Sequence, residues 1–335
     1  MSRCLKGVLS SLFIALFLAF VQPATAESVA PPSRIALVER VIATAEAAVA
    51  DPRWVSGSQW EAFKNRIRDP DLQALETDEF VSAFNSAAGA LPFSHFRLHW
   101  QPESGGPEAA ETSIVLTWPG EDIALVRMRA FEGDPAIVTQ TMREVVAAQP
   151  RALIIDLRGT PGGSFPTAVA LSQGIRSEPI DAGAFLTRAW YARYGTLPNE
   201  EQYSKIKPLE VAELSGFVEQ LRRDGAARLV LPGHKKPVYE GPVIILVDGG
   251  TASTCEPFVH LTQQLGAVVI GETTAGAMLS GEYFPMDESF RIFLPVADYV
   301  TPDLQRLDGR GVTPDIEVPP QQALERALTE IESSS

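Results

Sequence analysis

The segment "GGTASTCEPF", residues 249–258, holds two side chains that could act as a nucleophile, Ser253 and Cys255. Ser253 and Glu256 match the S-x-x-E pattern of a capping box, in which the hydroxyl only accepts hydrogen bonds from helix amides. The same position suits a nucleophile, because a serine at a strand-to-helix turn projects from the sheet edge near the positive end of the helix dipole. The amide of Thr254 would then lie beside a developing oxyanion. The local sequence leaves capping and catalysis both open.

Cys255 is the rival nucleophile of this segment. It is expected within the first turn of a helix, where a thiolate can be activated. Cysteine is also small, mildly apolar and among the most often buried residues, so packing is the favoured role. The other cysteine, Cys4, lies in an N-terminal segment that is predicted to be removed. The mature chain is therefore expected to contain no internal disulfide and no cysteine-based zinc site.

A serine nucleophile needs a general base, and four histidines could supply one. His260 is expected on the same helix as Ser253, about 10 Å further along the axis at 1.5 Å per residue, which is too far. His234 stands beside two lysines in a loop, which favours a solvated basic patch. If "HFRLHW" is extended, His95 and His99 share one face of a strand. His95 is therefore a candidate base, and a structural, hydrogen-bonded histidine is the alternative.

The segment "RGTPGG", residues 158–163, is a second loop with possible chemistry. It can be interpreted simply as a tight turn. Its functional interpretation is that the amide of Gly162 or of Gly163, free of a side chain, donates to a developing oxyanion. No lysine or G-K-[ST] pattern follows the glycines, which excludes a phosphate-binding loop.

Hydrophobic periodicity predicts the elements that must position these residues. Apolar residues at helical spacing predict helices over about residues 33–90, and apolar runs on both sides of "PGED" predict a β-hairpin. Further along the chain, nearly continuous apolar strands alternate with helices, which predicts an α/β fold with a largely parallel sheet covered by helices. The expected helices are at 134–148, 165–175, 255–266 and from 321, and the expected strands are near 151–157, 242–247, 267–271 and 290–294.

Ligands of such sheets bind beyond the carboxyl ends of the strands. Two of these ends carry the loops already described, at 159–163 and 249–253, so both loops are expected at one site. The section from 177 to 240 is less regular, with one expected helix near 209–223. It contains several aromatic residues, including Trp190, Tyr191, Tyr194 and Tyr203, and the aromatic residues near 185–203 could line an apolar pocket.

The first 26 residues have the pattern of a secretory signal peptide. Arg3 and Lys6 precede an apolar core of about ten residues, and an A-x-A cleavage site ends at Ala26, whereas a spanning helix needs roughly 20 apolar residues. The mature chain of about 309 residues is therefore expected to be exported, periplasmic or secreted, without a membrane span. Its net charge is near −16, because the whole chain carries −14 and the leader removes two positive charges. An acidic chain argues against nucleic acid and anionic membranes as partners.

Four blocks, in this order and spacing, resemble the tail-specific (carboxyl-terminal processing) and tricorn family of serine peptidases: "ALIIDLRGTPGG", "GPVIILVDGGTASTCEPF", "LGAVVIGETTAG" and "DGRGVTPDIEV". The resemblance covers roughly residues 80–320. It implies a ClpP/crotonase-like β-β-α superhelix preceded by a small helical segment. The implied domains are a signal peptide over 1–26, a helical segment over 27–92, a peptidase domain over 93–320 and a C-terminal helix over 321–335.

The resemblance assigns roles to individual residues. The family carries its nucleophile at the middle serine of an S-A-S-A-S-E block, which falls on Ser253, and Cys255 takes the place of a serine that is not the nucleophile. The tail-specific branch places a lysine base just after the G-E-x-T-x-G block, but this chain has Ala277 there and no room for a PDZ domain. The tricorn-like branch, with a Ser-His pair that matches Ser94 and His95, is more similar.

That branch also has an acid before its G-V-x-P-D turn, and this chain has Asp308 where glutamate is usual. Aspartate is one methylene shorter, so its reach to the histidine is left open. The implied reaction is acyl transfer on a peptide or protein substrate, without metal or cofactor. His95 would take the proton of Ser253, while Ser94 and Asp308 orient or stabilise the imidazolium. The oxyanion donors would be the amides of Thr254 and of Gly162 or Gly163.

Two other functions remain open for such a chain. The family includes retinoid-binding proteins, so a non-catalytic protein that binds a small apolar ligand or a peptide is one alternative. A hydratase-like enzyme on the same fold is another, although no coenzyme A signature is recognised in the sequence. Fold analogy alone does not separate these functions. The sequence predicts no oligomeric state.

Overall fold

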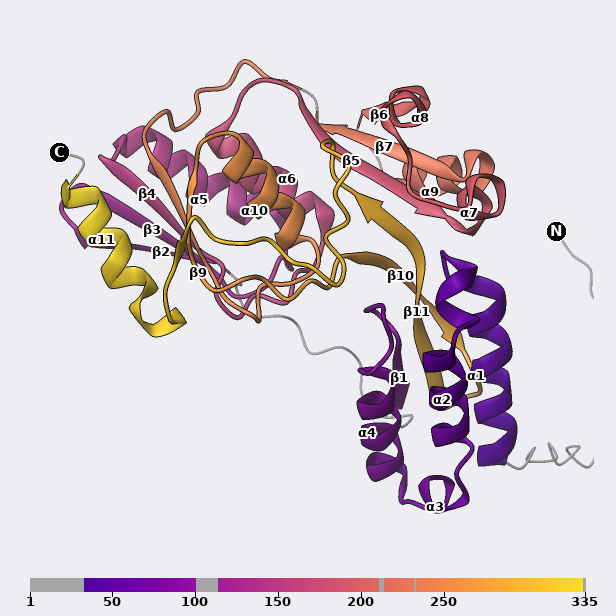
Figure 1. Cartoon of the computed structure of the whole chain (residues 1–335). Coiled ribbons are helices and arrows are strands. Elements are labelled where there is room, and N and C mark those ends of the chain that lie inside the picture. The colour runs from indigo at the N-terminus through magenta and orange to yellow at the C-terminus, as the bar shows by residue number, and fades with distance from the viewer. Residues whose placement is uncertain (1–32, 101–113, 211–213, 232, 334–335) are drawn as a thin grey trace, which may run out of the picture. The chain divides into compact units, whose positions relative to one another are not determined.

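The computed structural model describes residues 33–100, 114–210, 214–231 and 233–333. The predicted signal peptide lies outside these residues. The described part begins with helices that form where the periodicity predicts them (Figure 1). They are α1 (Arg34–Ala48), α2 (Ser58–Ile67), α3 (Pro70–Gln73) and α4 (Thr77–Ala88), with a 3-10 turn at Pro52–Val55.

These helices bury one apolar face each against a separate core. The buried residues of α1 follow the predicted i, i+3, i+4, i+7 spacing from Val38 to Ala45. Aromatic rings of α2 and α4 fill the centre, where Trp60 is fully buried and Phe63 packs edge-to-face on Phe84. Asp51 caps the 3-10 turn by accepting from the amide of Arg53. Strand residues close this core from the other side, so the helical segment is packed on a sheet.

A six-stranded sheet carries the predicted strand–helix units, in the order β12-β9-β8-β4-β3-β2. Its hairpin of β2 and β3 is antiparallel, as predicted, and every other pairing is parallel. The strands are β2 (Ile114–Gly120), β3 (Ile123–Met128), β4 (Ala152–Asp156), β8 (Val243–Val247), β9 (Val268–Gly271) and β12 (Ile316–Glu317).

Both faces of this sheet are covered by helices, which explains its continuous apolar strands. Successive side chains of a strand point to opposite faces, so Ile155 packs with the core under α5, α6 and α10, whereas Ile154 packs with the core under α11. Figure 1 shows α11 on the opposite side of the sheet from α6 and α10. These helices are α5 (Pro135–Ala148), α6 (Phe165–Ile175), α10 (Cys255–Gln264) and α11 (Ala323–Ser333).

A second six-stranded sheet was not predicted, and it corrects the interpretation of 177–240 as irregular. Its order is β1-β11-β5-β7-β6, with β10 also paired to β11, and its pairs are antiparallel except for β6 with β7. The expectation of a largely parallel sheet therefore holds for the first sheet alone. A bulge between Asp181 and Ala184 breaks the alternation of β5, which hides the strand in the sequence.

The elements of this second sheet bring distant segments together. The strand predicted near 290–294 is longer, because β11 continues to Val300 and pairs with three other strands. Among the described helices, none is both long enough and apolar enough to cross a membrane. The strands are β1 (Arg97–Trp100), β5 (Ile180–Thr187), β6 (Pro208–Glu210), β7 (Ala226–Leu231), β10 (Leu279–Pro285) and β11 (Phe290–Val300), and the helices between them are α7 (Arg188–Tyr194), α8 (Glu200–Lys205) and α9 (Leu214–Asp224).

Candidate active site

The two loops predicted to meet at the sheet edge lie side by side. Asp248, just after β8, accepts hydrogen bonds from the amides of Gly250 and Gly159, both at 2.8 Å. The amide of Ala252 donates to the carbonyl of Thr160 at 3.0 Å. The carboxyl ends of β4 and β8 therefore form one connected surface, as the parallel pairing of these strands requires.

The turn before α10 directs the hydroxyl of Ser253 away from the helix amides. Ser253 has a left-handed backbone conformation with φ of 55°, and the N-cap residue of α10 is Thr254, without a side-chain capping bond. Half of the capping box is present, because Glu256 accepts from the amide of Ser253 at 3.1 Å. The hydroxyl itself lies 3.4 Å from Nε2 of His95. The capping role considered for this hydroxyl is therefore wrong.

Ser94, His95 and Asp308 form a continuous chain of hydrogen bonds behind Ser253. Ser94 Oγ donates to Asp308 Oδ1 at 2.5 Å and lies 2.7 Å from Nδ1 of His95. Because the hydroxyl has one proton and gives it to the carboxylate, it must accept from Nδ1–H of the imidazole. This fixes the tautomer, so Nε2 carries the lone pair that faces Ser253. The shorter aspartate thus reaches the histidine through Ser94.

His95 takes this position because it precedes the strand rather than belonging to it. The strand β1 begins at Arg97, and His95 has a left-handed backbone with φ of 61°. The predicted extended run in which His95 and His99 share a face is therefore wrong. His99 packs its ring against Tyr283, with ring centroids 5.3 Å apart.

The remaining two histidines have other partners. His260 Nε2 lies 2.9 Å from Asp303 Oδ1, and His234 Nε2 lies 3.0 Å from the carbonyl of Arg176. Both lie in the part of the chain that the structure describes, as do His95 and His99, so of the four histidines only His95 contacts Ser253.

Burial and charge act in opposite directions on His95. Burial lowers the pKa of the imidazole below its usual value, and the negative charge of Asp308 opposes this by raising it. Asp308 is itself only 2% exposed and receives a guanidinium N–H of Arg306 at 3.0 Å. The Nε of Arg306 contacts both oxygens of Asp298, which also accepts from the hydroxyl of Tyr191. Asp308, the candidate acid, is therefore buried beside the guanidinium cation of Arg306.

The glycines of the "RGTPGG" loop approach the serine turn so closely that no side chain fits. A Cβ on Gly162 would lie 2.6 Å from Cβ of Ser253, and one on Gly163 would collide with the carbonyl of Phe131. Both glycines have positive φ, at 94° and 138°. Thr254 Oγ1 donates to the carbonyl of Gly163 at 2.8 Å and ties the two loops together.

Two backbone amides of these loops are available as donors. Among the described residues, no acceptor is found for the amides of Gly163 and Thr254. Gly162 differs, because its backbone hydrogen-bonds the thiol of Cys255. That thiol is fully buried, and burial raises its pKa, as expected for a packing role rather than a reactive thiolate.

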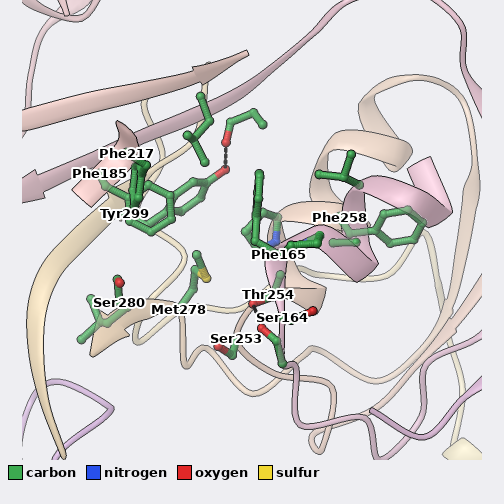
Figure 2. A pocket seen from close by; sticks show the side chains of 18 of the residues that line it. Ser164, Phe165, Phe185, Phe217, Ser253, Thr254, Phe258, Met278, Ser280 and Tyr299 are labelled. Carbon is green, nitrogen blue, oxygen red and sulfur yellow. Dashed lines mark hydrogen bonds between the residues drawn. The ribbon is translucent and has the colours of Figure 1, made fainter. Parts of the chain in front are cut away.

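An apolar cavity of about 370 Å³ lies beside Ser253 (Figure 2). Its wall comes from α6, α9, α10 and the second sheet, and no Asp, Glu, Lys or Arg among the described residues lines it. Ser253 and His95 also line an open groove of about 1190 Å³, which Ser94 and Asp308 border. The aromatic lining comprises Phe165, Phe185, Phe217, Phe258, Phe293 and Tyr299. Of the aromatic residues near 185–203 that could line a pocket, Phe185 lines this cavity, whereas Trp190, Tyr191, Tyr194 and Tyr203 do not.

Sequence reasoning missed two charged residues of this region. Glu256 was interpreted only as part of a capping box, and Arg306 was not singled out. The signal for Arg306 was weak, because a lone arginine two residues before an aspartate has no motif of its own. Within the described residues, no group of three or more His, Cys, Asp or Glu side chains could hold a metal ion.

Comparison with known sequences relates the chain to a peptidase family. The profile of Peptidase family S41 matches residues 122–318, which include Gly162, Gly163, Ser253 and Asp308 but not His95. A carboxyl-terminal-processing protease from Synechocystis sp. is 24% identical over 258 residues, which cover 73% of this chain and 51% of that protein. A carboxyl-terminal-processing peptidase from Arabidopsis thaliana is 31% identical over only 94 residues, which cover 19% of its length. The chain thus spans about half the length, or less, of these relatives.

Solved structures relate nearly the whole chain to one fold. A protein from Parabacteroides merdae, described as a candidate peptidase, has a TM-score of 0.61 at 12% identity, over 90% of this chain and 97% of that one. The photosystem II D1 C-terminal processing protease has a TM-score of 0.51 at 14% identity, over 87% and 94% of the chains. At these identities the likeness concerns the fold alone. The family follows from the sequence profile, which accounts for more than half of the chain, and the protein therefore belongs to peptidase family S41.

Proposed function

We propose that this protein is an exported serine-type peptidase that hydrolyses peptide bonds through an acyl-enzyme. The observation that carries the proposal is the line of contacts from Asp308 through Ser94 and His95 to the hydroxyl of Ser253. A nucleophile, a base and a group that orients the base are the components that acyl transfer requires. Membership of family S41 and the carboxyl-terminal-processing relative support the reaction class.

In the first step, His95 Nε2 accepts the proton of Ser253 Oγ as the oxygen attacks the substrate carbonyl. Nδ1 keeps its proton and donates it in a hydrogen bond to Ser94 Oγ, which likewise keeps its own proton and donates it to Asp308. The imidazolium that forms is therefore stabilised without proton transfer to the acid. The imidazolium then gives the Nε2 proton to the leaving amine, and the C–N bond breaks. Water repeats the sequence on the ester and releases the acid product.

The tetrahedral intermediate places a negative charge next to the serine turn. The amides of Thr254 and Gly163 are our proposed donors to this oxyanion, because neither has another acceptor among the described residues. Gly162, the other candidate, is engaged with the Cys255 thiol. A donor of this kind contributes a factor of about 10² to 10³ in rate.

The apolar cavity predicts which substrates are cleaved fastest. The side chain on the acyl side of the scissile bond must lie next to Ser253, where the wall is aromatic and aliphatic. Peptides with Phe or Leu at that position should exceed the Ala peptide in kcat/KM by about 10- to 100-fold, from apolar burial alone. Asp or Lys should be slower than Ala, because burying an unpaired charge is costly. Steady-state kinetics on a matched peptide series measures this order.

A variant on α6 provides the control for that series. Ala168 lines the cavity, so Ala168→Phe should reduce the preference for Phe over Ala at least ~10-fold, whereas Gln173→Phe adds the same ring outside the cavity lining and should leave it unchanged. Equal cleavage of all peptides would contradict the assignment of the cavity. No cleavage of any peptide, with tight binding of apolar ligands, would favour the alternative of a non-catalytic binding protein, since that function would use the same cavity.

Export is the second part of the proposal and rests on the leader pattern of residues 1–26, including the A-x-A site that ends at Ala26. Expression of the full chain in a bacterial host should yield, outside the cytoplasm, a protein that begins near Glu27. Mass spectrometry of that fraction measures the cleavage. A mass that retains Met1–Ala26 would contradict export by signal cleavage.

The finer fold assignment is also part of the proposal. We assign the chain to the ClpP/crotonase-like superhelix, supported by its strand–helix units and by its two adjacent loops at the sheet edge. The domain limits of 27–92, 93–320 and 321–335 remain a proposal. The Ser94–His95 contact supports the tricorn-like branch over the Ser–Lys branch, since Ala277 stands at the lysine position.

A further inference from the structure

Glu256 places a buried carboxylate directly behind the serine turn. The residue is fully buried in the first turn of α10, and its two oxygens accept four hydrogen bonds. Oε2 accepts from the amides of Ser253 at 3.1 Å and Ala277 at 2.8 Å. Oε1 accepts from the amide of Gly276 at 2.8 Å and from the hydroxyl of Thr274 at 2.6 Å. Every group that faces this carboxylate is a donor.

The donor set requires an ionised carboxylate. Backbone amides can only donate, and the Thr274 hydroxyl accepts from the amide of Val312 at 2.7 Å, so its own proton is directed at Glu256. A protonated carboxyl could donate only to the Thr274 hydroxyl, whose own proton would then have no acceptor among these partners. Burial raises the pKa of Glu256, and the four hydrogen bonds act against this rise.

The segment 274–277 is in turn bonded to the loop that carries the acid. The amide of Gly309, the residue after Asp308, donates to the carbonyl of Gly276 at 2.7 Å, and the amide of Thr274 donates to the carbonyl of Val312. Gly276 has φ of 64°, and a Cβ there would lie 2.9 Å from the amide nitrogen of Arg310. The side chain of Glu256 therefore bonds both the serine turn and the segment against which the acid loop is held.

We infer that Glu256 is a positioning residue for the proposed reaction: it holds the left-handed backbone of Ser253, and through segment 274–277 it fixes Ser253 relative to Asp308. A left-handed conformation is unfavourable for a non-glycine residue and persists only where the surroundings over-determine it. The amide of Ser253 has two acceptors, Glu256 and the carbonyl of Ala277, and both belong to this arrangement. The inference rests on the proposed function of Ser253.

Glu256→Gln tests this role, because its amide group must place NH₂ against a backbone N–H in either orientation. We expect kcat for the best peptide to fall about 10- to 100-fold with KM changed less than about twofold, since the alignment of the nucleophile is lost rather than the substrate contacts. The rate of covalent labelling by a fluorophosphonate should fall by the same factor. Both are measured well below the midpoint of thermal unfolding.

Thr274→Val is the matched control. It removes one hydrogen bond from the same buried carboxylate and the side-chain acceptor of the Val312 amide. It leaves the contact with the Ser253 amide and the backbone bonds between segment 274–277 and the acid loop. We expect it to lower the unfolding midpoint while kcat stays within about threefold of wild type. If Glu256→Gln does not fold, Glu256→Asp, which keeps the charge but not the reach, should show the same fall in kcat.

Two results would overturn the inference while the wild type is active. The first is a kcat within twofold of wild type for Glu256→Gln, or for Glu256→Asp if that variant takes its place. The second is a loss of kcat in Thr274→Val equal to that in the Glu256 variant. A wild type that neither cleaves peptides nor reacts with the fluorophosphonate would instead refute the proposed function itself, and the positioning role with it.

Discussion

Replacing Ser253 by alanine should abolish peptide hydrolysis, by at least ~10⁴-fold in kcat, and leave the fold unchanged. The hydroxyl is the single group near Nε2 of His95 that can form the acyl-enzyme, and the serine turn is held by backbone contacts that alanine retains. Hydrolysis of the best peptide and labelling by a fluorophosphonate, compared with wild type, measure the loss. Circular dichroism and the thermal midpoint check the fold.

Cys255→Ser is the control for this variant. The thiol is fully buried, and burial raises its pKa, so it cannot supply a thiolate near neutral pH. We expect kcat of Cys255→Ser within about threefold of wild type, with some loss of stability from a hydroxyl in an apolar core. An inactive Cys255→Ser, together with inhibition of the wild type by thiol reagents, would reverse the assignment of the nucleophile.

The first sheet could be predicted from sequence because its signals are local. Its strands are apolar without interruption, its helices have the expected spacing, and Asp134 followed by Pro135 marks the start of α5. The second sheet could not be predicted, because its pairings are long-range and its strand β5 is interrupted by a bulge. Its partner β11 pairs with β1 and β5, which lie far earlier in the chain, and no periodicity within 11 residues can reveal these pairings.

The candidate site also has one part that could be predicted from sequence and one part that could not. The loops at the ends of β4 and β8 follow from parallel pairing, so their proximity could be predicted. Ser94 and Asp308 were candidates by resemblance alone, because contacts across more than 200 residues leave no local trace. His95 was a candidate from the residues, but its pattern did not distinguish a base from a structural histidine. Part of the cavity wall comes from strands that were not predicted, including β5 and β7. For this reason the substrate side chain that we propose for the cavity could not be predicted from the sequence.

The surroundings of His95 also determine how the site is expected to respond to pH. The proposed reaction requires neutral His95, since Nε2 would accept the proton of Ser253. Burial holds the pKa of His95 below its usual value of about 6.5, and the charge of Asp308 limits this decrease. Activity should therefore be lost on acidification only below the pH at which a free imidazole titrates. Removing the charge of Asp308 should move the loss to still lower pH.

His95→Ala should lower kcat/KM by about 10³-fold or more and remove the acid limb of its pH profile. In the wild type, kcat/KM should rise with pH through one apparent pKa below 6.5 and then level off, because protonated His95 cannot act as a base. Asp308→Asn should shift this limb toward lower pH and also reduce kcat, since an amide can donate to Ser94 and select the wrong tautomer. His99→Ala, which loses only a ring contact with Tyr283, should keep the limb. Retention of near wild-type activity by His95→Ala, or an unchanged limb in that variant, would exclude His95 as the base.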